Sequence, residues 1–261
     1  MRALAKKAFI LFINRIVVGT LKRVHLNVFW GNLLLTINKS AGFLENKKFV
    51  ICLKTIEGSH SYDAYHAPGN IAWRLHTLVW AAENAAKLSG DFVECGVFKG
   101  DFSWVISEML AFGKLPKTFF LYDSFAGFSE SISAPEDFPD EPNFYAEANI
   151  IYSDPTLYPN VQKRFAHLPN IKVIKGFVPE VLDGTAPEKI AFLHIDLNSP
   201  GAEVAALEIL FDHVVSGGYV VFDDYGWFAA RKQKDAIDAF FAPRGYSVLE
   251  LPTGQGLVIK R

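Results

Sequence analysis

The chain of 261 residues has only two cysteines and no apolar run long enough to span a membrane. A spanning helix needs about 18 or more consecutive apolar residues, and the early apolar run over 8–13 ends at Asn14 and Arg15. The same interruption argues against a signal peptide. Cys52 and Cys95 lack zinc-ligand spacing, and Cys95 falls at the end of an expected strand, where a disulfide is awkward. We therefore expect two reduced thiols and a cytoplasmic protein.

Acidic residues are missing from the first 44 positions, which hold seven basic residues, so within the net charge of −2 the rest of the chain carries −9. An acidic body repels the phosphates of nucleic acids. The sequence therefore predicts no nucleic-acid partner.

The basic N-terminal segment is amphipathic at helical spacing. Lys7, Asn14, Arg15 and Lys22 fall on one stripe. The apolar residues away from this stripe are Phe9, Ile10, Phe12, Ile13, Val17 and Leu21. Two interpretations remain open for residues 1–40. The helix packs on the protein itself or on a second subunit of a homo-oligomer, or it lies as a peripheral anchor on the inner face of a membrane.

From residue 67 onward, helical and strand patterns alternate, which is typical of an α/β fold with a doubly wound, mostly parallel sheet. A Gly-containing turn over 252–255 predicts that the last two strands form an antiparallel hairpin. We divide the chain into an N-terminal helical extension (1–66) and an α/β domain (67–261), and we expect residues 124–154 to form a substrate lid loop. The seven expected strands cover 91–97, 117–123, 171–175, 190–196, 219–223, 246–251 and 256–260.

Three aspartates follow two of the expected strands. Asp196 ends one strand, and the pair Asp223 and Asp224 ends another 27 residues later. Carboxylates held close together repel one another unless a cation joins them. Oxygen ligands alone favour Mg²⁺, Ca²⁺ or Mn²⁺ over zinc. The alternative without a metal is that one of Asp223 and Asp224 caps a helix and the other is solvated.

The segment 92–100 runs from a strand into a turn bounded by Gly96 and Gly100, ahead of a helix. Such a turn lets backbone approach a nucleotide. Its spacing departs from Gly-x-Gly-x-x-Gly, which argues against a nicotinamide dehydrogenase. Glu94 in this strand and Asp123, which ends the next one, fit a nucleoside with a cationic tail rather than a phosphorylated one.

Five motifs in this order resemble those of the macrocin O-methyltransferase family. They are 93–100 (VECGVFKG), 122–128 (YDSFAGF), 175–177 (KGF), 194–197 (HIDL), and Gly217-Gly218 followed by 223–226 (DDYG). This family is a branch of the class I S-adenosylmethionine-dependent methyltransferases and modifies sugar hydroxyls with the help of a divalent metal. The resemblance covers about residues 90–261.

The resemblance implies a Rossmann-like class I methyltransferase fold and a role for each matched position. The methyl donor S-adenosyl-L-methionine would lie against Glu94, Gly96, Gly100, Asp123, Ser124, Phe125 and Gly176. A divalent metal, Mg²⁺ or else Ca²⁺ or Mn²⁺, would be held by Asp196, Asp223 and Asp224. The acceptor would be a small glycosyl molecule.

A sugar hydroxyl attacks poorly at neutral pH, and a metal together with a carboxylate base would activate it. We expect Asp196 to be that base, with His194 as the rival because it shares a strand face with Asp196. Two other functions remain open: a metal-dependent catechol or phenol O-methyltransferase, and a non-catalytic S-adenosylmethionine-binding or membrane-associated module.

Signals for acceptor recognition are weaker. Asn198 stands where relatives tend to have a second acid, and the run 231–235 is expected to be a solvated helix face. Arg74 and His76 lie on an expected helix and are candidates for contact with the acceptor, although a surface helix carries such residues routinely. The aromatic and histidine candidates for sugar stacking are Tyr62, Tyr65, His66, Phe138, Phe144 and Tyr145.

Overall fold

The computed structural model describes residues 12, 28–31, 34–59, 71–141 and 143–261. The chain forms two compact units, residues 1–77 and 78–261. In the first unit, β1 (Val28–Gly31) and β2 (Leu34–Ile37) pair antiparallel, and η2 (Gly42–Glu45) precedes α3 (Lys47–Ser59). This hairpin departs from the expected helical extension, and the β-branched residues Thr36 and Ile37 in β2 favour a strand.

Helix α4 (Ala72–Ala85) continues across the division between the two units, at Thr77 and Leu78. The domain boundary expected near residue 66 falls within 60–70, outside the described residues, and stays a prediction. Most of the amphipathic segment 1–40 also lies outside them.

The second unit is built on a seven-stranded sheet with the order β5-β4-β3-β6-β7-β9-β8. The pairs among β3, β4, β5, β6 and β7 are parallel, and β9 pairs antiparallel with both β7 and β8. This arrangement confirms the predicted doubly wound, mostly parallel sheet and its C-terminal hairpin. The strands are β3 (Asp91–Cys95), β4 (Phe119–Asp123), β5 (Ile171–Lys175), β6 (Ile190–Ile195), β7 (Val214–Phe222), β8 (Leu249–Glu250) and β9 (Gly256–Ile259).

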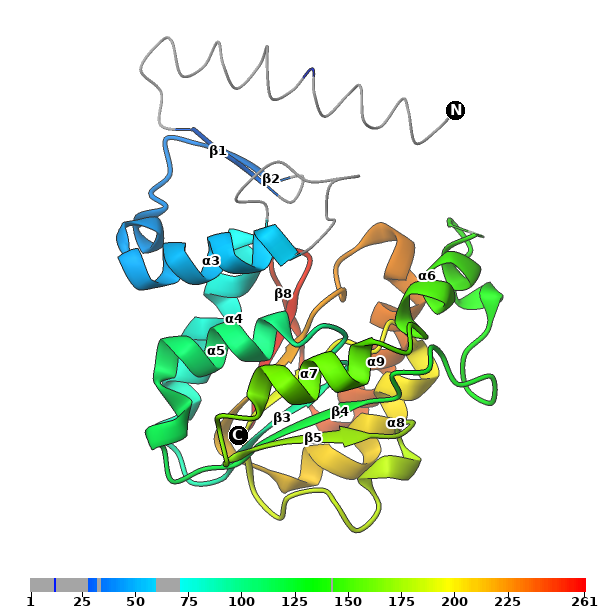
Figure 1. The fold of residues 1–261 in the computed structure, drawn as a ribbon. Coiled ribbons are helices and arrows are strands. Elements are labelled where there is room, and N and C mark those ends of the chain that lie inside the picture. Colours follow the sequence, from blue (N-terminus) through cyan, green and yellow to red (C-terminus); the bar gives the residue numbers. More distant parts are fainter. Residues whose placement is uncertain (1–11, 13–27, 32–33, 60–70, 142) are drawn as a thin grey trace. The chain divides into compact units, whose positions relative to one another are not determined.

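Helices cover both faces of this sheet (Figure 1). On one face, α5 (Asp101–Leu110) and α7 (Leu157–Phe165) pack on the strands through Ile106, Val161 and Phe165. On the other face, α8 (Pro200–Leu210) and α9 (Arg231–Phe241) contribute apolar residues to a second cluster. The short 3-10 helices are η4 (Phe112–Lys114), η5 (Pro135–Asp137), η6 (Glu180–Leu182), η7 (Phe211–His213), η8 (Phe228–Ala230) and η9 (Ala242–Arg244).

Aromatic packing holds the centre of the first cluster. The Phe92 ring on β3 lies 5.1 Å from the rings of Phe112 and Phe192 and 5.7 Å from that of Phe119. Each such pair adds about 0.5–1.5 kcal/mol beyond the burial of its apolar area. The strands that end at the site are therefore anchored in a tightly packed interior.

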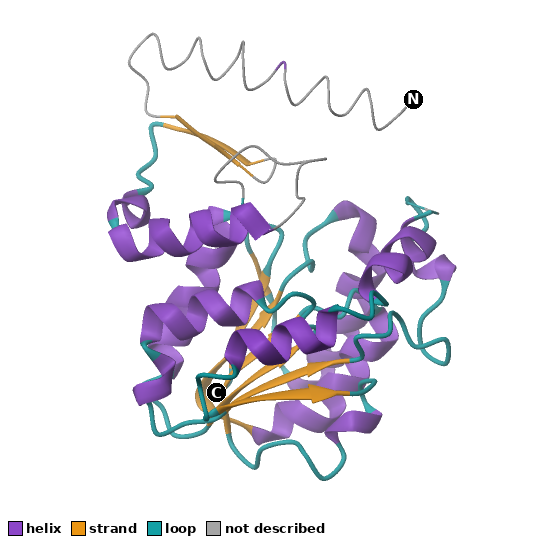
Figure 2. Ribbon diagram, in the orientation of Figure 1, coloured by secondary structure: helices purple, strands orange, loops and turns teal. Residues whose placement is uncertain are grey.

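The segment 124–154 is more structured than a lid loop. It contains η5 and the helix α6 (Phe144–Tyr152), which is drawn as a purple helix in Figure 2. Phe144, Ala148 and Tyr152 recur at helical spacing and pack with Phe128 and Phe138 in a small apolar cluster. The surrounding proline and acidic residues masked this helical signal in the sequence.

Candidate active site

An acidic cluster lies at the carboxyl edge of β6 and β7. One oxygen each from Asp196, Asp223 and Asp224 lies within 4.8 Å of the other two. The strands β6 and β7 are neighbours, so the expected convergence of the two motifs is correct. Three oxygen donors at this separation fit a hard divalent cation such as Mg²⁺ or Mn²⁺.

Neighbouring side chains orient two of these carboxylates. Asn198 Nδ2 donates a 3.2 Å hydrogen bond to Asp196 Oδ1, within the turn after β6. Gln255 Nε2 donates a 3.2 Å hydrogen bond to Asp223 Oδ1 and is fully buried, and Thr253 Oγ1 donates to Gln255 Oε1. The sequence did not predict a role for Gln255 at the site, because the pattern over 252–255 indicated only a hairpin turn. Nothing local indicates that this turn reaches back to the end of β7.

Glu203 on α8 is a fourth acid close to the cluster, and its side chain is fully buried. Its Oε1 accepts hydrogen bonds from the Leu197 amide at 3.3 Å and from Gln233 Nε2 at 2.5 Å. Burial, and then the nearby Asp196 carboxylate, raise the pKa of Glu203 well above its usual range. Glu203 thus supports the turn that carries Asp196 through its contact with the Leu197 amide.

The contact to Gln233 corrects the expectation that 231–235 is a solvated helix face. Arg231 forms a 2.8 Å ion pair with Asp140, and Lys232 Nζ donates to the Glu136 carbonyl. Lys234 Nζ lies 4.0 Å from the centre of the Tyr225 ring. Arg231, Lys232 and Asp235 are exposed as expected, and Gln233 is the buried exception. Charge alone does not reveal this exception or the docking of the segment 124–154 on α9.

A buried line of polar groups crosses three strands beside the cluster. His194 Nδ1 lies 2.8 Å from Glu94 Oε1, and His194 Nε2 lies 4.0 Å from Asp223 Oδ1. All three side chains are buried, and that of His194 is fully so. His194 and Asp196 were expected on the same face of the sheet. Their exposure differs, because His194 is fully buried and Asp196 is partly exposed.

Asp123 closes the glycine-bounded turn after β3. Its Oδ2 accepts the amides of Val97 at 2.7 Å and Phe98 at 2.8 Å, and its Oδ1 accepts the amide of Phe125 at 2.7 Å. Burial raises the pKa of Asp123, and these three amides act in the opposite direction. A carboxylate has about four lone-pair sites, so acceptor capacity remains for a ligand hydroxyl.

Three non-glycine residues next to the site have left-handed backbone. Phe98 has φ 49°, Phe125 has φ 46° and Asn198 has φ 52°, after β3, β4 and β6 respectively. Such conformations cost of order 1–3 kcal/mol each and cluster at functional sites. No sequence pattern indicated these three conformations.

The glycines of the matched motifs are needed for packing within the protein. A Cβ on Gly96, which has φ +89°, would lie 1.8 Å from the Asp196 carbonyl oxygen. A Cβ on Gly176 would lie 2.6 Å from Val181 Cγ2, and one on Gly100 would lie 2.9 Å from the Phe165 ring. Gly96 therefore lets the turns after β3 and β6 come together.

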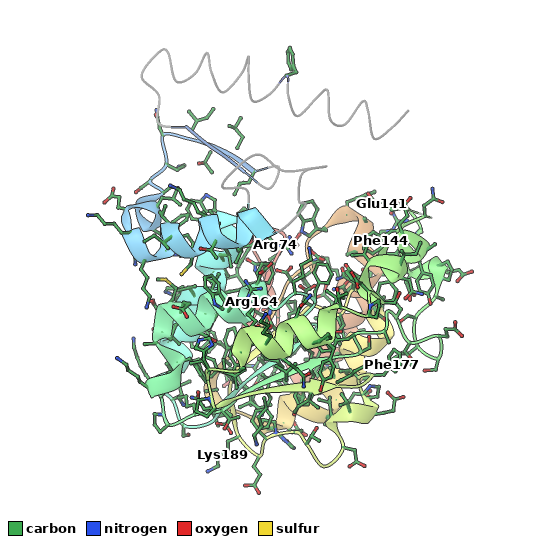
Figure 3. All side chains as sticks on the ribbon, in the orientation of Figure 1. Arg74, Glu141, Phe144, Arg164, Phe177 and Lys189 are labelled. Atoms are coloured by element: carbon green, nitrogen blue, oxygen red, sulfur yellow. The ribbon has the colours of Figure 1, made fainter. Side chains whose placement is uncertain are left out.

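The other described residues expected at the donor and acceptor sites make packing and turn contacts within the protein. Ser124 Oγ donates to the Gly127 carbonyl and stabilises a turn, and Phe125 is buried against Tyr158. The expected sugar-stacking rings of Phe138, Phe144 and Tyr145 instead pack in the small apolar cluster on α6, where Figure 3 labels Phe144. Tyr62, Tyr65 and His66 lie outside the described residues.

Arg74 and His76 belong to the first compact unit, on α4. The His76 ring stacks on Phe43 at 4.3 Å, and burial lowers the pKa of His76. This contact gives His76 a packing role within its own unit. A role of either residue toward an acceptor stays a prediction.

Cys52 and Cys95 are both buried and unbridged, and burial raises the pKa of the Cys95 thiol. Among the described residues, no helix combines the length and apolar character needed to cross a membrane. The cytoplasmic location expected from the cysteines stays a prediction.

Comparison with known proteins supplies the family. The sequence profile described as Macrocin-O-methyltransferase (TylF) matches residues 71–247, more than half of the chain, and confirms the resemblance read from the motifs. The mycinamicin III 3''-O-methyltransferase of Micromonospora griseorubida is 26% identical over 159 residues, which cover 58% of this chain and 62% of that enzyme. This chain thus spans less than two thirds of that relative's length.

A second relative, the 8-demethyl-8-(2,3-dimethoxy-alpha-L-rhamnosyl)-tetracenomycin-C 4'-O-methyltransferase of Streptomyces olivaceus, is 27% identical over 179 residues and 67% of each chain. Among solved structures, the O-methyltransferase NovP superposes with a TM-score of 0.66 at 18% identity, covering 85% of this chain and 99% of that one. This likeness shows a shared fold.

Proposed function

The chain belongs to the macrocin O-methyltransferase family, and we propose that it transfers the methyl group of S-adenosyl-L-methionine to a hydroxyl of a sugar or glycosylated acceptor. The convergence of Asp196, Asp223 and Asp224 at the sheet edge that also carries Asp123 supports this proposal most strongly. Both relatives are named as O-methyltransferases, and the name of the second specifies a rhamnosyl compound. Ligands of open α/β folds bind at this edge of the sheet.

The methyl donor would bind across the ends of β3 and β4. We assign its ribose hydroxyls to the remaining acceptor capacity of Asp123 and its cationic methionine end to the side of Glu94. Gly96, Gly100, Ser124, Phe125 and Gly176 shape the surrounding turns. When bound, the donor supplies a methyl group on a sulfonium, which is an electrophile.

Asp196, Asp223 and Asp224 would hold a divalent cation, with Mg²⁺ as the first choice and Mn²⁺ or Ca²⁺ as alternatives. A cation there would supply the positive charge that makes an acceptor hydroxyl easier to deprotonate. Asp196 would take the proton as the hydroxyl oxygen bonds to the methyl carbon, while the bond from that carbon to sulfur breaks and S-adenosylhomocysteine leaves. Partial exposure of Asp196 and complete burial of His194 favour Asp196 as the base.

A screen of acceptors tests the proposed function. Labelled S-adenosyl-L-methionine is incubated with sugar nucleotides, glycosylated natural products and catechols, each with Mg²⁺ or with chelator. Label in a glycosyl product that depends on Mg²⁺ supports the proposal. Label only in phenols would move the acceptor to the catechol class, and donor binding without label in any acceptor would favour the non-catalytic module.

We also propose that residues 1–40 make a contact of their own, on a second subunit of a homo-oligomer or on a membrane surface. The support is their seven basic residues, the absence of acids and their amphipathic spacing. Deleting 1–40 changes the mass in solution in the first case and liposome association in the second. A deletion that alters neither measurement would contradict this part of the proposal.

A further inference from the structure

Glu94, His194 and Asp223 stand in line across three adjacent strands. Glu94 on β3 is directly opposite His194 on β6, and His194 is opposite Val221 on β7. Asp223 lies two residues beyond Val221 and therefore on the same face of the sheet. The line leads from the proposed methyl-donor end of the site to the acidic cluster.

Two atoms in this line are buried without a hydrogen-bond partner among the described residues, Glu94 Oε2 and His194 Nε2. The nearest acid to His194 Nε2 is Asp223, whose Oδ1 lies at 4.0 Å, beyond hydrogen-bond distance. Phe102 on α5 packs near the imidazole, with 5.9 Å between ring centres. Unsatisfied polar atoms in a buried site commonly mark a place where a ligand binds or a group moves.

We propose that His194 is a positioning residue that couples the methyl-donor end of the site to the acidic cluster, so that a ligand at either end strengthens binding at the other. The inference rests on the proposed function. A cationic donor group gives Glu94 Oε2 a partner and fixes Glu94 together with the imidazole bonded to it. A shift of about 1 Å then brings Nε2 within hydrogen-bond distance of Asp223 Oδ1, and an imidazole with a proton on each nitrogen donates to both carboxylates.

The same fixation works in the opposite direction. A cation that orders Asp223 holds the imidazole and, through the 2.8 Å contact, Glu94. The first ligand to bind bears the entropic cost of fixing these three side chains. The second ligand does not bear that cost again, so it binds more tightly than it would alone. Thermodynamic linkage requires the two enhancements to be equal.

Calorimetric titration of the full chain measures this coupling. S-adenosylhomocysteine is titrated with and without Mn²⁺, and Mn²⁺ with and without S-adenosylhomocysteine. The coupling ratio is the affinity for one ligand in the presence of the other, divided by its affinity in the absence of the other. For the unaltered protein we expect a ratio of about five or more, which is the lower range of typical coupling.

Two variants at His194 isolate the connection. In His194→Asn the amide nitrogen replaces Nδ1 but nothing replaces Nε2, so the Glu94 contact remains and the coupling ratio is expected to fall to about one. In His194→Gln the amide nitrogen reaches only the Nε2 side, and loss of the Glu94 contact is expected to abolish the ratio as well. The second variant serves if the first folds poorly by circular dichroism.

Gln255→Met is the matched control. It removes the other donor to the same Asp223 oxygen without touching Glu94. We expect it to weaken Mn²⁺ binding while the coupling ratio persists, because the line through His194 is intact. A loss of coupling in this variant would show that any disturbance of Asp223 suffices, and would overturn the role given to His194.

The outcomes separate this inference from the proposed function. Binding of both ligands to the unaltered protein with a ratio of one overturns the coupling and leaves the methyltransferase proposal standing. An unchanged ratio in His194→Asn overturns the role of His194. If neither ligand binds the unaltered protein, the proposed function fails, and the coupling fails with it.

Discussion

Ser133 Oγ donates a 2.7 Å hydrogen bond to Ser199 Oγ, which joins the segment 124–154 to the N-terminus of α8. Both side chains are buried. The contact is reinforced at Gly201, where a Cβ would lie only 2.5 Å from the Ile132 carbonyl oxygen. The segment expected to cover the acceptor is thus attached to the turn that carries Asp196 and Asn198.

Ser133→Ala is expected to raise the KM for the glycosyl acceptor about 2- to 12-fold, which corresponds to the loss of one hydrogen bond. The KM for S-adenosyl-L-methionine should not change, because the methyl donor is assigned to the ends of β3 and β4. Steady-state kinetics with each substrate varied in turn checks this. Ser131→Ala is the control, since exposed Ser131 bonds only to Ser129 among the contacts described. An unaltered acceptor KM in Ser133→Ala would refute the attachment as a determinant of acceptor binding.

Replacing Gln255 with Leu is expected to weaken divalent-metal affinity by about 10-fold, because groups that orient metal ligands typically contribute 10- to 100-fold. Gln255 holds Asp223 Oδ1 from within the protein. Titration with Mn²⁺, followed by calorimetry, measures the change. Glu250→Gln on the same hairpin breaks only a pair with Lys234, and it should leave the affinity unchanged. Equal affinities in all three proteins would contradict the orienting role of Gln255.

The stability difference between Glu203→Gln and the unaltered protein should depend on pH. Burial raises the folded-state pKa of Glu203 well above its value in the unfolded chain, which is about 4.3. The stability that the protonated group contributes is complete below that pH and is lost as pH rises through the folded-state pKa. The variant does not titrate, so its relative stability should increase across this window.

Urea unfolding at a series of pH values in chelator measures this difference. Exposed Glu208 on the same helix provides the control variant Glu208→Gln, whose difference from the unaltered protein should stay flat. A pH-independent difference for Glu203→Gln would mean that Glu203 is ionised in the folded protein.

Gly96→Ala should destabilise the protein by more than about 4 kcal/mol, in the range reserved for severe core damage. Its Cβ would overlap the Asp196 carbonyl oxygen, and φ is +89°. Gly184→Ala is the matched control, because Gly184 has φ +66° with no atom within 4 Å of a Cβ. Only the left-handed backbone penalty of about 1–2 kcal/mol applies there. Similar losses in the two variants, measured by urea unfolding, would contradict the close approach of the two turns.

The sequence predicted the parts of the fold that depend on local pattern. Alternating apolar strands and helices gave the sheet, and strand-end acids gave Asp123, Asp196 and the pair at 223–224. Parallel strands deliver their carboxyl ends to one edge, so topology alone brings these acids together.

The rest depended on contacts between distant segments. Gln255, Glu203 and Ser199 act on the site across separations that no periodicity encodes, and Gln233 looked like part of a charged surface. The aromatic residues of 124–154 were expected on a binding surface, but those on α6 pack against Phe128 and Phe138 from the loop before it.

The rate of methyl transfer as a function of Mg²⁺ tests the central claim most directly. The protein is freed of metal with a chelator, then assayed with labelled S-adenosyl-L-methionine and a glycosyl acceptor while Mg²⁺ is restored. The account predicts negligible transfer without metal, a rate that saturates with Mg²⁺, and a loss of about 10- to 100-fold or more in Asp223→Asn at limiting metal. Full transfer in excess chelator, unchanged in Asp223→Asn, would contradict it.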